Sequence, residues 1–95
     1  MNLGAAIKIL RRKSLMSQSD FAEAIGITQP YLSLIEKNRK KPSLEVLEKI
    51  SNSLKTPLPI LFWFSVGRDD VPEDRQYIFD TLKPSIDKLV DEVFN

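Results

Sequence analysis

The chain has 95 residues, of which 42% are hydrophobic and 28% charged, and its formal net charge is +1. This length and composition predict one small globular domain, with room for an appended element. Because the chain contains neither cysteine nor histidine, a disulfide framework, a thiolate nucleophile and the commonest metal ligand are excluded, and we expect no enzyme, no cofactor and no metal site.

The first predicted helix runs from about Asn2 to Lys13. Its apolar face recurs at spacings of four and three and consists of Leu3, Ile7 and Leu10. The second half of the helix is basic, which is favourable near a helix C-terminus, and carries Lys8, Arg11, Arg12 and Lys13. Residues 14–16 form the connection to the next helix, where we expect Leu15 to pack into the core.

Residues 18–36 contain two short helical patterns that meet at Gly26. Each pattern has an apolar pair on one face, and the two pairs are Phe21 with Ile25 and Leu32 with Ile35. Ala22 lies beside the first pair, where a second helix must cross closely. Gly26 can adopt the positive φ angle that turns the chain after a short helix. A helix, a glycine-containing turn and a second helix form the arrangement of a DNA-binding helix-turn-helix.

Capping residues precede both of these helices. Ser17 stands before the first, with Asp20 three residues later in place of the Glu or Gln that a capping box prefers. Thr28 offers its hydroxyl to the second helix. Pro30 falls in the first turn of that helix, where its missing N–H costs nothing. The capping residues and the apolar pairs therefore indicate the same helix boundaries.

On these residues, the chain resembles the phage-repressor or Cro type of helix-turn-helix domain. The residues that match the family pattern in type are Phe21, Ala22, Ile25, Gly26, Ile27, Leu32 and Ile35, and the resemblance extends from about Ile7 to Leu54. It implies an all-α fold, with a compact repressor-like bundle of about five helices in residues 1–66. We expect residues 67–95 to form a C-terminal helical extension that lies outside the minimal DNA-binding unit. The alternative is an ordinary αα-hairpin that does not touch DNA.

The resemblance makes the helix from about Thr28 to Lys37 the candidate recognition helix. We expect DNA to be contacted by Gln18, Thr28, Gln29, Pro30, Tyr31, Ser33, Leu34, Lys37, Arg39 and Lys40. Gln29 can pair with adenine through its amide, and Pro30 and Leu34 suit contact with thymine methyl groups. The family residue that matches Gln18 contacts a phosphate. The alternatives are that Leu34 is an ordinary exposed leucine and that Gln18 is a solvated glutamine, neither of which contacts DNA.

Glu36 ends this helix as a negative charge near the predicted DNA surface. In the family, a glutamate here pairs with an arginine of the first helix, which corresponds to Arg11, so we expect a structural ion pair. Asn38 stands where the family usually has glycine, and asparagine is the next best residue for a left-handed position. Residues 37–41 contain four cations, which suits phosphate binding, although a merely solvated basic loop is the alternative.

The next helix is predicted to begin after Ser43, which is its N-cap, and to end near Lys55. Glu45 lies in the first turn, where a negative charge is favourable. The face that closes the core of the head consists of Leu44, Leu47, Ile50 and Leu54.

The character of the chain changes after Lys55. Residues 1–55 carry ten Lys or Arg against five Asp or Glu, whereas residues 56–95 carry four against eight. A basic half followed by an acidic half indicates a polyanion-binding head and a tail that faces something else, and a solvated charge pattern without function is the alternative. Residues 60–64 are apolar on every side of a helical turn, so the head alone cannot cover them.

The acidic tail carries a short apolar seam with spacings of three and four, made of Phe79, Leu82, Ile86, Leu89 and Val93. Pro84 interrupts the pattern, so we expect either a kink or two helices, Glu73–Leu82 and Ser85–Phe94. The tail folds back over residues 62–64 or pairs with the tail of a second chain, and the two options can coexist. For the second option, the expected dimerisation residues are those of the seam together with Phe62 and Trp63.

The sequence as a whole indicates a sequence-specific regulator of transcription that binds double-stranded DNA, acts as a repressor and forms a homodimer on a two-fold operator. The alternative is a protein-interaction module, such as an antitoxin-like regulator whose acidic tail binds a partner protein. The longest apolar run, residues 58–66, is too short to span a bilayer, and no signal peptide opens the chain. We therefore expect a cytoplasmic protein without a membrane segment.

Overall fold

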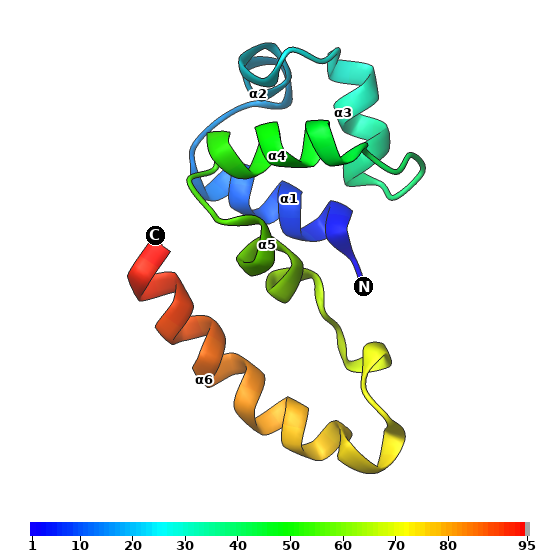
Figure 1. Ribbon diagram of the computed structural model, residues 1–95, viewed down its shortest axis with the longest axis vertical. Coiled ribbons are helices and arrows are strands. Elements are labelled where there is room, and N and C mark those ends of the chain that lie inside the picture. Colours follow the sequence, from blue (N-terminus) through cyan, green and yellow to red (C-terminus); the bar gives the residue numbers. More distant parts are fainter. Residues whose placement is uncertain (95) are drawn as a thin grey trace.

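The computed structural model describes residues 1–94, and in these residues it contains helices but no strand. The α-helices are α1 (Leu3–Lys13), α2 (Gln18–Ile25), α3 (Gln29–Glu36), α4 (Leu44–Ser53), α5 (Leu58–Ser65) and α6 (Gln76–Phe94), and the two short 3₁₀ helices are η1 (Arg68–Asp70) and η2 (Glu73–Arg75). Helices α1–α5 form a head, and α6 extends below it (Figure 1). The prediction of an all-α bundle of five helices with a C-terminal helical extension is confirmed.

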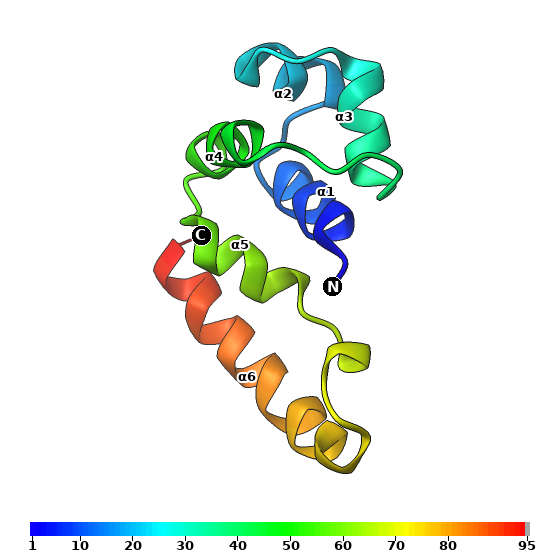
Figure 2. The same cartoon turned by 45° about the vertical axis from the view of Figure 1, so that its right-hand side comes forward.

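The five helices of the head share one hydrophobic core. Helix α1 packs against α3 and α5, while α2 packs against α3 and α4 (Figure 2). The largest fully buried apolar side chains come from all five helices and are Ile7, Phe21, Leu32, Ile35, Ile50 and Leu61. Ala22 is also buried, as its place beside the crossing helix requires. The core therefore holds α2 and α3 in a fixed relation to α1.

The turn between α2 and α3 is defined by its caps. The Ser17 hydroxyl accepts from the Asp20 N–H at 3.0 Å, and the Thr28 hydroxyl accepts from the Tyr31 N–H at 3.2 Å. Gly26 has a φ angle of 74°, in the left-handed region where a residue without a Cβ is not strained. Helix α3 is one residue shorter at each end than predicted, because Thr28 and Lys37 are its caps.

Two leucines that were expected in the core lie in solvent. Leu15 is 93% exposed, because the chain turns through a left-handed conformation at this residue, and Met16 packs against the core in its place. Leu44 is 62% exposed, because it starts α4 at the edge of the apolar stripe. The buried face of α4 is formed by Leu47 and Ile50, and Leu54 just beyond the helix is buried as well.

Helix α6 is continuous over 19 residues, so the prediction of two separate helices is wrong. Pro84 lies inside it and removes the N–H that would bond to the carbonyl of Asp80. Both residues are exposed, so water can reach the carbonyl that loses its helical donor. The sequence pattern could not reveal that the helix continues despite the lost hydrogen bond.

The link between α5 and α6 is tied down by two acidic residues. The Gly67 N–H donates to Asp70 Oδ2 at 2.8 Å, and this bond, assisted by the Met1 ammonium 2.7 Å from Oδ1, holds the pKa of Asp70 below its ordinary value. Arg68 Nε pairs with Asp80 Oδ2 at 3.0 Å. These contacts direct the chain back toward the head.

Helix α6 folds back onto the head through polar contacts. Trp63 Nε1 donates to Asp87 Oδ1 at 2.8 Å, and Lys83 Nζ donates to the same oxygen at 3.0 Å and to the Trp63 carbonyl at 3.2 Å. The Lys83 ammonium also lies 4.6 Å from the centre of the Trp63 ring. Lys13 of α1 pairs with Asp91 at 3.3 Å. We call the contacts among these five residues the polar latch.

Candidate nucleic-acid interface

The outer side of α3 gathers most of the residues that were expected to meet DNA. Thr28, Gln29 and Pro30 are exposed at its N-terminal end, and Tyr31, Ser33 and Leu34 are half-buried along its length. On the opposite side, Leu32 and Ile35 are fully buried. Helix α3 is therefore anchored by one apolar stripe and presents amide, hydroxyl and apolar groups to solvent.

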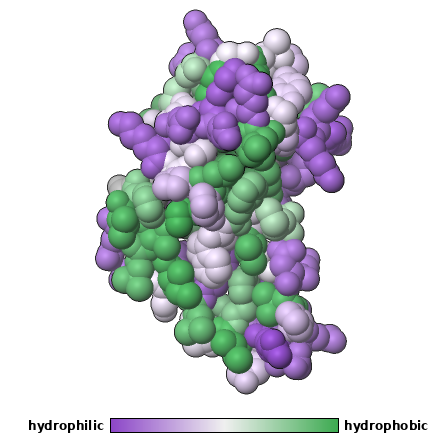
Figure 3. Space-filling view, in the orientation of Figure 1, coloured by the Kyte–Doolittle hydropathy of each residue, from purple (hydrophilic) through white to green (hydrophobic). Residues whose placement is uncertain are grey.

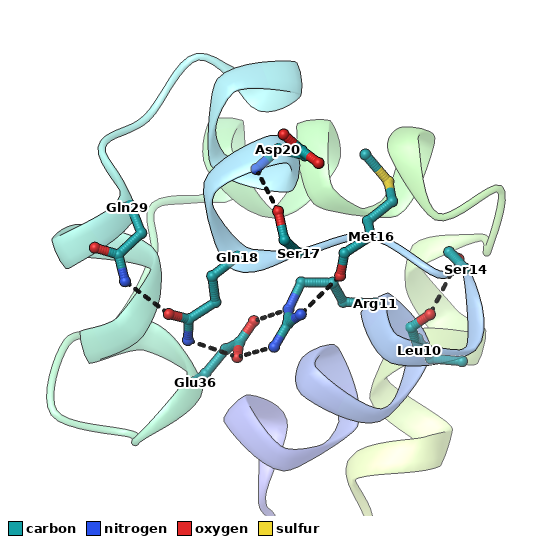
Figure 4. Close-up of polar contacts among 9 residues, drawn as sticks. All are labelled: Leu10, Arg11, Ser14, Met16, Ser17, Gln18, Asp20, Gln29 and Glu36. Atoms are coloured by element: carbon teal, nitrogen blue, oxygen red, sulfur yellow. Dashed lines mark hydrogen bonds and ion pairs between the residues drawn. The ribbon is translucent and has the colours of Figure 1, made fainter.

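Arg11 and Glu36 form the ion pair that the resemblance implies (Figure 4). Arg11 Nε and Nη2 donate to Glu36 Oε2 and Oε1 at 2.8 and 3.0 Å, and the two side chains are only 7% and 2% exposed. Arg11 Nη1 donates to the Met16 carbonyl at 2.8 Å. The pair thus joins α1, the α1–α2 connection and the end of α3.

Two glutamines extend this pair to the surface. Gln18 Nε2 donates to Glu36 Oε1 at 3.0 Å, and Gln29 Nε2 donates to Gln18 Oε1 at 2.7 Å (Figure 4). A carboxylate can only accept, so Gln18 must turn its amino group toward Glu36 and its carbonyl oxygen toward Gln29. Gln29 then retains one N–H and its carbonyl oxygen for another partner. The buried pair therefore sets the orientation of an exposed amide on α3.

The N-terminal end of α1 lies against the C-terminal end of α3. Asn38 has a φ angle of 58°, its Oδ1 accepts from the Gly4 N–H at 2.9 Å, and its Nδ2 donates to Asn2 Oδ1 at 2.6 Å. A Cβ on Gly4 would lie 2.5 Å from the carbonyl oxygens of Ile35 and Glu36, so only glycine permits this approach. Sequence reasoning missed this junction, although a glycine inside a helical pattern was a signal for it.

The loop after α3 presents four exposed cations, which are Lys37, Arg39, Lys40 and Lys41. The backbone N–H groups of Arg39 and Lys40 donate to the Leu34 carbonyl at 2.9 and 3.3 Å, so the loop is fixed to α3. Within residues 1–94, none of these four side chains forms a salt bridge. Their charge is therefore available to an anion beside the outer side of α3.

Two other kinds of feature are absent from the described residues. Across residues 1–94, acidic side chains do not gather in a group that could hold a metal ion. In the same part of the chain, no helix is both long and apolar enough to cross a membrane. The outer side of α3 and the loop that follows it are the surface on which the candidate function rests.

Comparison with known proteins gives three informative similarities. The helix-turn-helix family model matches residues 7–61. The chain is 27% identical over 94 residues to the immunity repressor protein of Bacillus phage phi105, which covers 98% of this chain and 62% of the repressor. It is 42% identical over 50 residues to the HTH-type transcriptional regulator SinR of Bacillus subtilis (strain 168), which covers 52% of this chain and 45% of SinR.

A solved structure resembles nearly the whole chain. The crystal structure of the clp gene regulator ClgR from Corynebacterium glutamicum matches with a TM-score of 0.69 and 25% sequence identity, over 88% of this chain and 89% of that one. The chain spans less than two thirds of the length of the phage phi105 immunity repressor and less than half of the length of SinR. The proteins named here are regulators or repressors.

Proposed function

We propose a function from the premise that the chain belongs to the helix-turn-helix family of transcriptional regulators, whose model matches more than half of the chain. We propose that the protein is a repressor that binds double-stranded DNA in a sequence-specific manner. The family is not one of enzymes, in agreement with the composition. The observation that carries the proposal is the orientation of the Gln29 amide beside four unpaired cations.

In this proposal, α3 enters the major groove and Gln29 contacts a base. Adenine presents an acceptor, N7, and a donor, its N6 amino group, on its major-groove edge. Gln29 retains one N–H and one carbonyl oxygen after its bond to Gln18, which is the pair of groups that adenine requires. Because Gln18 holds the amide in place before DNA arrives, less rotational freedom is lost on binding.

Apolar and hydroxyl groups of α3 complete the base contacts. Pro30 and Leu34 would meet thymine methyl groups, and Thr28 and Ser33 would lie at the edges of the contact. This assignment requires α3 to lie along the groove with its buried stripe facing the head, and that is the orientation in which the core holds it.

Phosphates are assigned to the polar groups around α3, namely Gln18, Tyr31, Lys37, Arg39 and Lys40. The cations of the loop neutralise phosphates and release counterions, which adds affinity without reading sequence. Gln18 has a second amide N–H that can reach a phosphate while its other groups orient Gln29. Fixing the loop to α3 through the Leu34 carbonyl keeps the cations in register with the base-contacting side chains.

Two copies of the chain would occupy a two-fold operator, with half-sites one helical turn, about 10 bp, apart. This homodimer acts in the cytoplasm and needs no cofactor. A second candidate function, an antitoxin-like module that binds a partner protein through its tail, is supported by one observation, the exposed apolar side of α6. Both candidates retain the DNA-binding head.

The test is to select duplexes from a random pool with the purified full chain and then to compare binding of a selected duplex with a scrambled one at several salt concentrations. We expect the selected duplex to bind about 10³-fold more tightly or better. Equal affinity for both duplexes, or a pool without enrichment, would contradict the proposal.

A further inference from the structure

Helix α6 has two faces of different character. The face toward the head is half-buried and carries Phe79, Lys83, Asp87, Val90, Asp91 and Phe94. The opposite face carries large apolar side chains that are 37% to 72% exposed, which are Ile78, Leu82, Ile86, Leu89 and Val93. We call these five residues the outer seam. A band of hydrophobic side chains follows α6 in the space-filling view (Figure 3).

The outer seam has the geometry of a helix-pairing surface. Its spacings of four, four, three and four place all five side chains within an arc of about 80° around the helix, over a length of about 22 Å. No charged residue belongs to the seam. An uninterrupted apolar stripe of this kind is stable in water only when another surface covers it.

The charges of α6 indicate what covers the seam. Asp80, Asp87 and Asp91 are paired with Arg68, Lys83 and Lys13 of the same chain. Among the described acidic residues of α6, this leaves only Glu92 outside an ion pair. A basic partner protein would therefore find almost no available carboxylate here. Two α6 helices, in contrast, can approach each other with little repulsion, because three of the four described acidic residues of each helix are neutralised by ion pairs within their own chain.

We propose that the outer seam packs against the outer seam of a second copy in antiparallel orientation, and that the polar latch sets the relative orientation of the two heads. The proposal rests on the DNA-binding function above and identifies its partner and geometry. An antiparallel pair centred between Ser85 and Ile86 places Leu82 against Leu89 of the second copy and aligns the helix dipoles favourably. Each contact occurs twice, as a two-fold interface requires.

The proposed dimer contact includes fewer residues than the sequence pattern indicated. Phe79 faces the head, and Trp63 is engaged by Lys83 and Asp87 within the chain. The dimer contact is therefore carried by the outer seam alone, and the latch remains intact in the dimer. Because the two faces of α6 are separate, the latch and the dimer contact can be disrupted independently.

The first experiment measures the mass in solution by light scattering. The full chain is compared with Leu82→Glu in the outer seam and with Leu15→Glu, which changes a leucine that is exposed as well but lies outside the seam. We expect the unmodified chain and Leu15→Glu to have twice the mass of one chain, and Leu82→Glu to have the mass of one chain with an unchanged helical spectrum. A monomeric unmodified chain, or a dimeric Leu82→Glu variant, would overturn the dimer contact.

The second experiment separates the latch from the dimer. The double variant Lys83→Ala/Asp87→Ala keeps good helix formers in α6, and Lys88→Ala on the same helix is its control. We expect the double variant to remain dimeric and to bind a selected duplex with two half-sites at least about tenfold more weakly, because heads without a fixed orientation lose effective concentration. Binding to a duplex with one half-site should be unchanged.

Unchanged affinity of the double variant for two half-sites would overturn the role of the latch. A selected duplex that contains a single half-site would overturn the two-fold geometry. Failure of the proposed function has a different signature, because the unmodified chain would then fail to prefer even the duplex with one half-site over a scrambled sequence.

Discussion

Arg11 in α1 and Glu36 in α3 are joined by two hydrogen bonds, of 2.8 and 3.0 Å, at a position that is almost closed to solvent. Removing one partner leaves a buried charge without compensation, so we expect Glu36→Ala to lower the free energy of unfolding by about 3–5 kcal/mol. Urea denaturation followed by circular dichroism measures this quantity. The control is Arg68→Ala, which breaks an exposed pair and should cost less than about 1 kcal/mol. Equal losses for the two variants would show that burial does not set the cost.

The bond between Gln18 and Gln29 predicts that the two glutamines act as a unit. Gln29→Ala should weaken binding to a selected duplex by about 1–3 kcal/mol and leave binding to a scrambled duplex unchanged. Gln18→Ala should weaken specific binding in the unmodified chain. The loss should be much smaller when Gln29 is already alanine, because Gln18 then has no Gln29 amide to orient. A double-mutant cycle measured by fluorescence anisotropy checks this. Strictly additive losses would contradict the prediction, because they would show that the two glutamines contribute to binding independently.

Arg39 is expected to contact a phosphate and to read no base. Arg39→Ala should therefore weaken binding to all sequences alike and reduce the slope of log K against log salt by about one unit. Arg75→Ala removes an exposed positive charge in η2, away from α3, and should leave the slope unchanged. If both variants change the slope equally, the loop has no special role.

Leu34 is expected to touch the methyl group of a thymine. Replacement of thymine by uracil in a selected duplex removes this methyl group and should weaken binding of the unmodified chain by about 1 kcal/mol, within the range of single base contacts. Leu34→Ala should bind the thymine and uracil duplexes with similar affinity. A penalty for uracil that persists in this variant would assign the methyl contact to another residue, such as Pro30.

Asn38 combines a left-handed backbone with two side-chain hydrogen bonds. Asn38→Gly loses the bonds but removes the Cβ that strains a left-handed backbone, whereas Asn38→Ala loses the same bonds and keeps the Cβ, at a cost of about 1 kcal/mol relative to glycine. We therefore expect the alanine variant to be the less stable of the two in urea denaturation. The reverse order would mean that the backbone conformation at this position is not maintained.

The sequence predicted those parts of the structure that local signals encode. Ser17, Gly26 and Thr28 marked the helix ends because each satisfies or relieves the backbone at its own position. Leu15 was misplaced because the direction of a side chain in a connection depends on a backbone conformation that no periodicity reports. The sequence left a kink and two separate helices open at Pro84, because the cost of a proline depends on whether water reaches the carbonyl that it leaves without a donor.

In the candidate site, too, only the features that local sequence signals encode could be predicted. The candidate base-contacting residues could be named from their positions along α3. The bond from Gln29 to Gln18 and the junction of Asn2, Gly4 and Asn38 could not, because they join residues that are 11, 34 and 36 positions apart and leave no repeating pattern. These long-range bonds orient the groups that the sequence only lists.

Trp63 is the only tryptophan in the chain, and its indole lies beneath the Lys83 ammonium with its N–H bonded to Asp87. Intrinsic fluorescence excited in the tryptophan band therefore originates at the junction between the head and α6, whereas the residues assigned to DNA include no tryptophan. Detachment of α6 would bring water to the indole and shift its emission to longer wavelength. The protein thus contains its own optical reporter of tail docking, and the docked and detached states of α6 can be distinguished without a label.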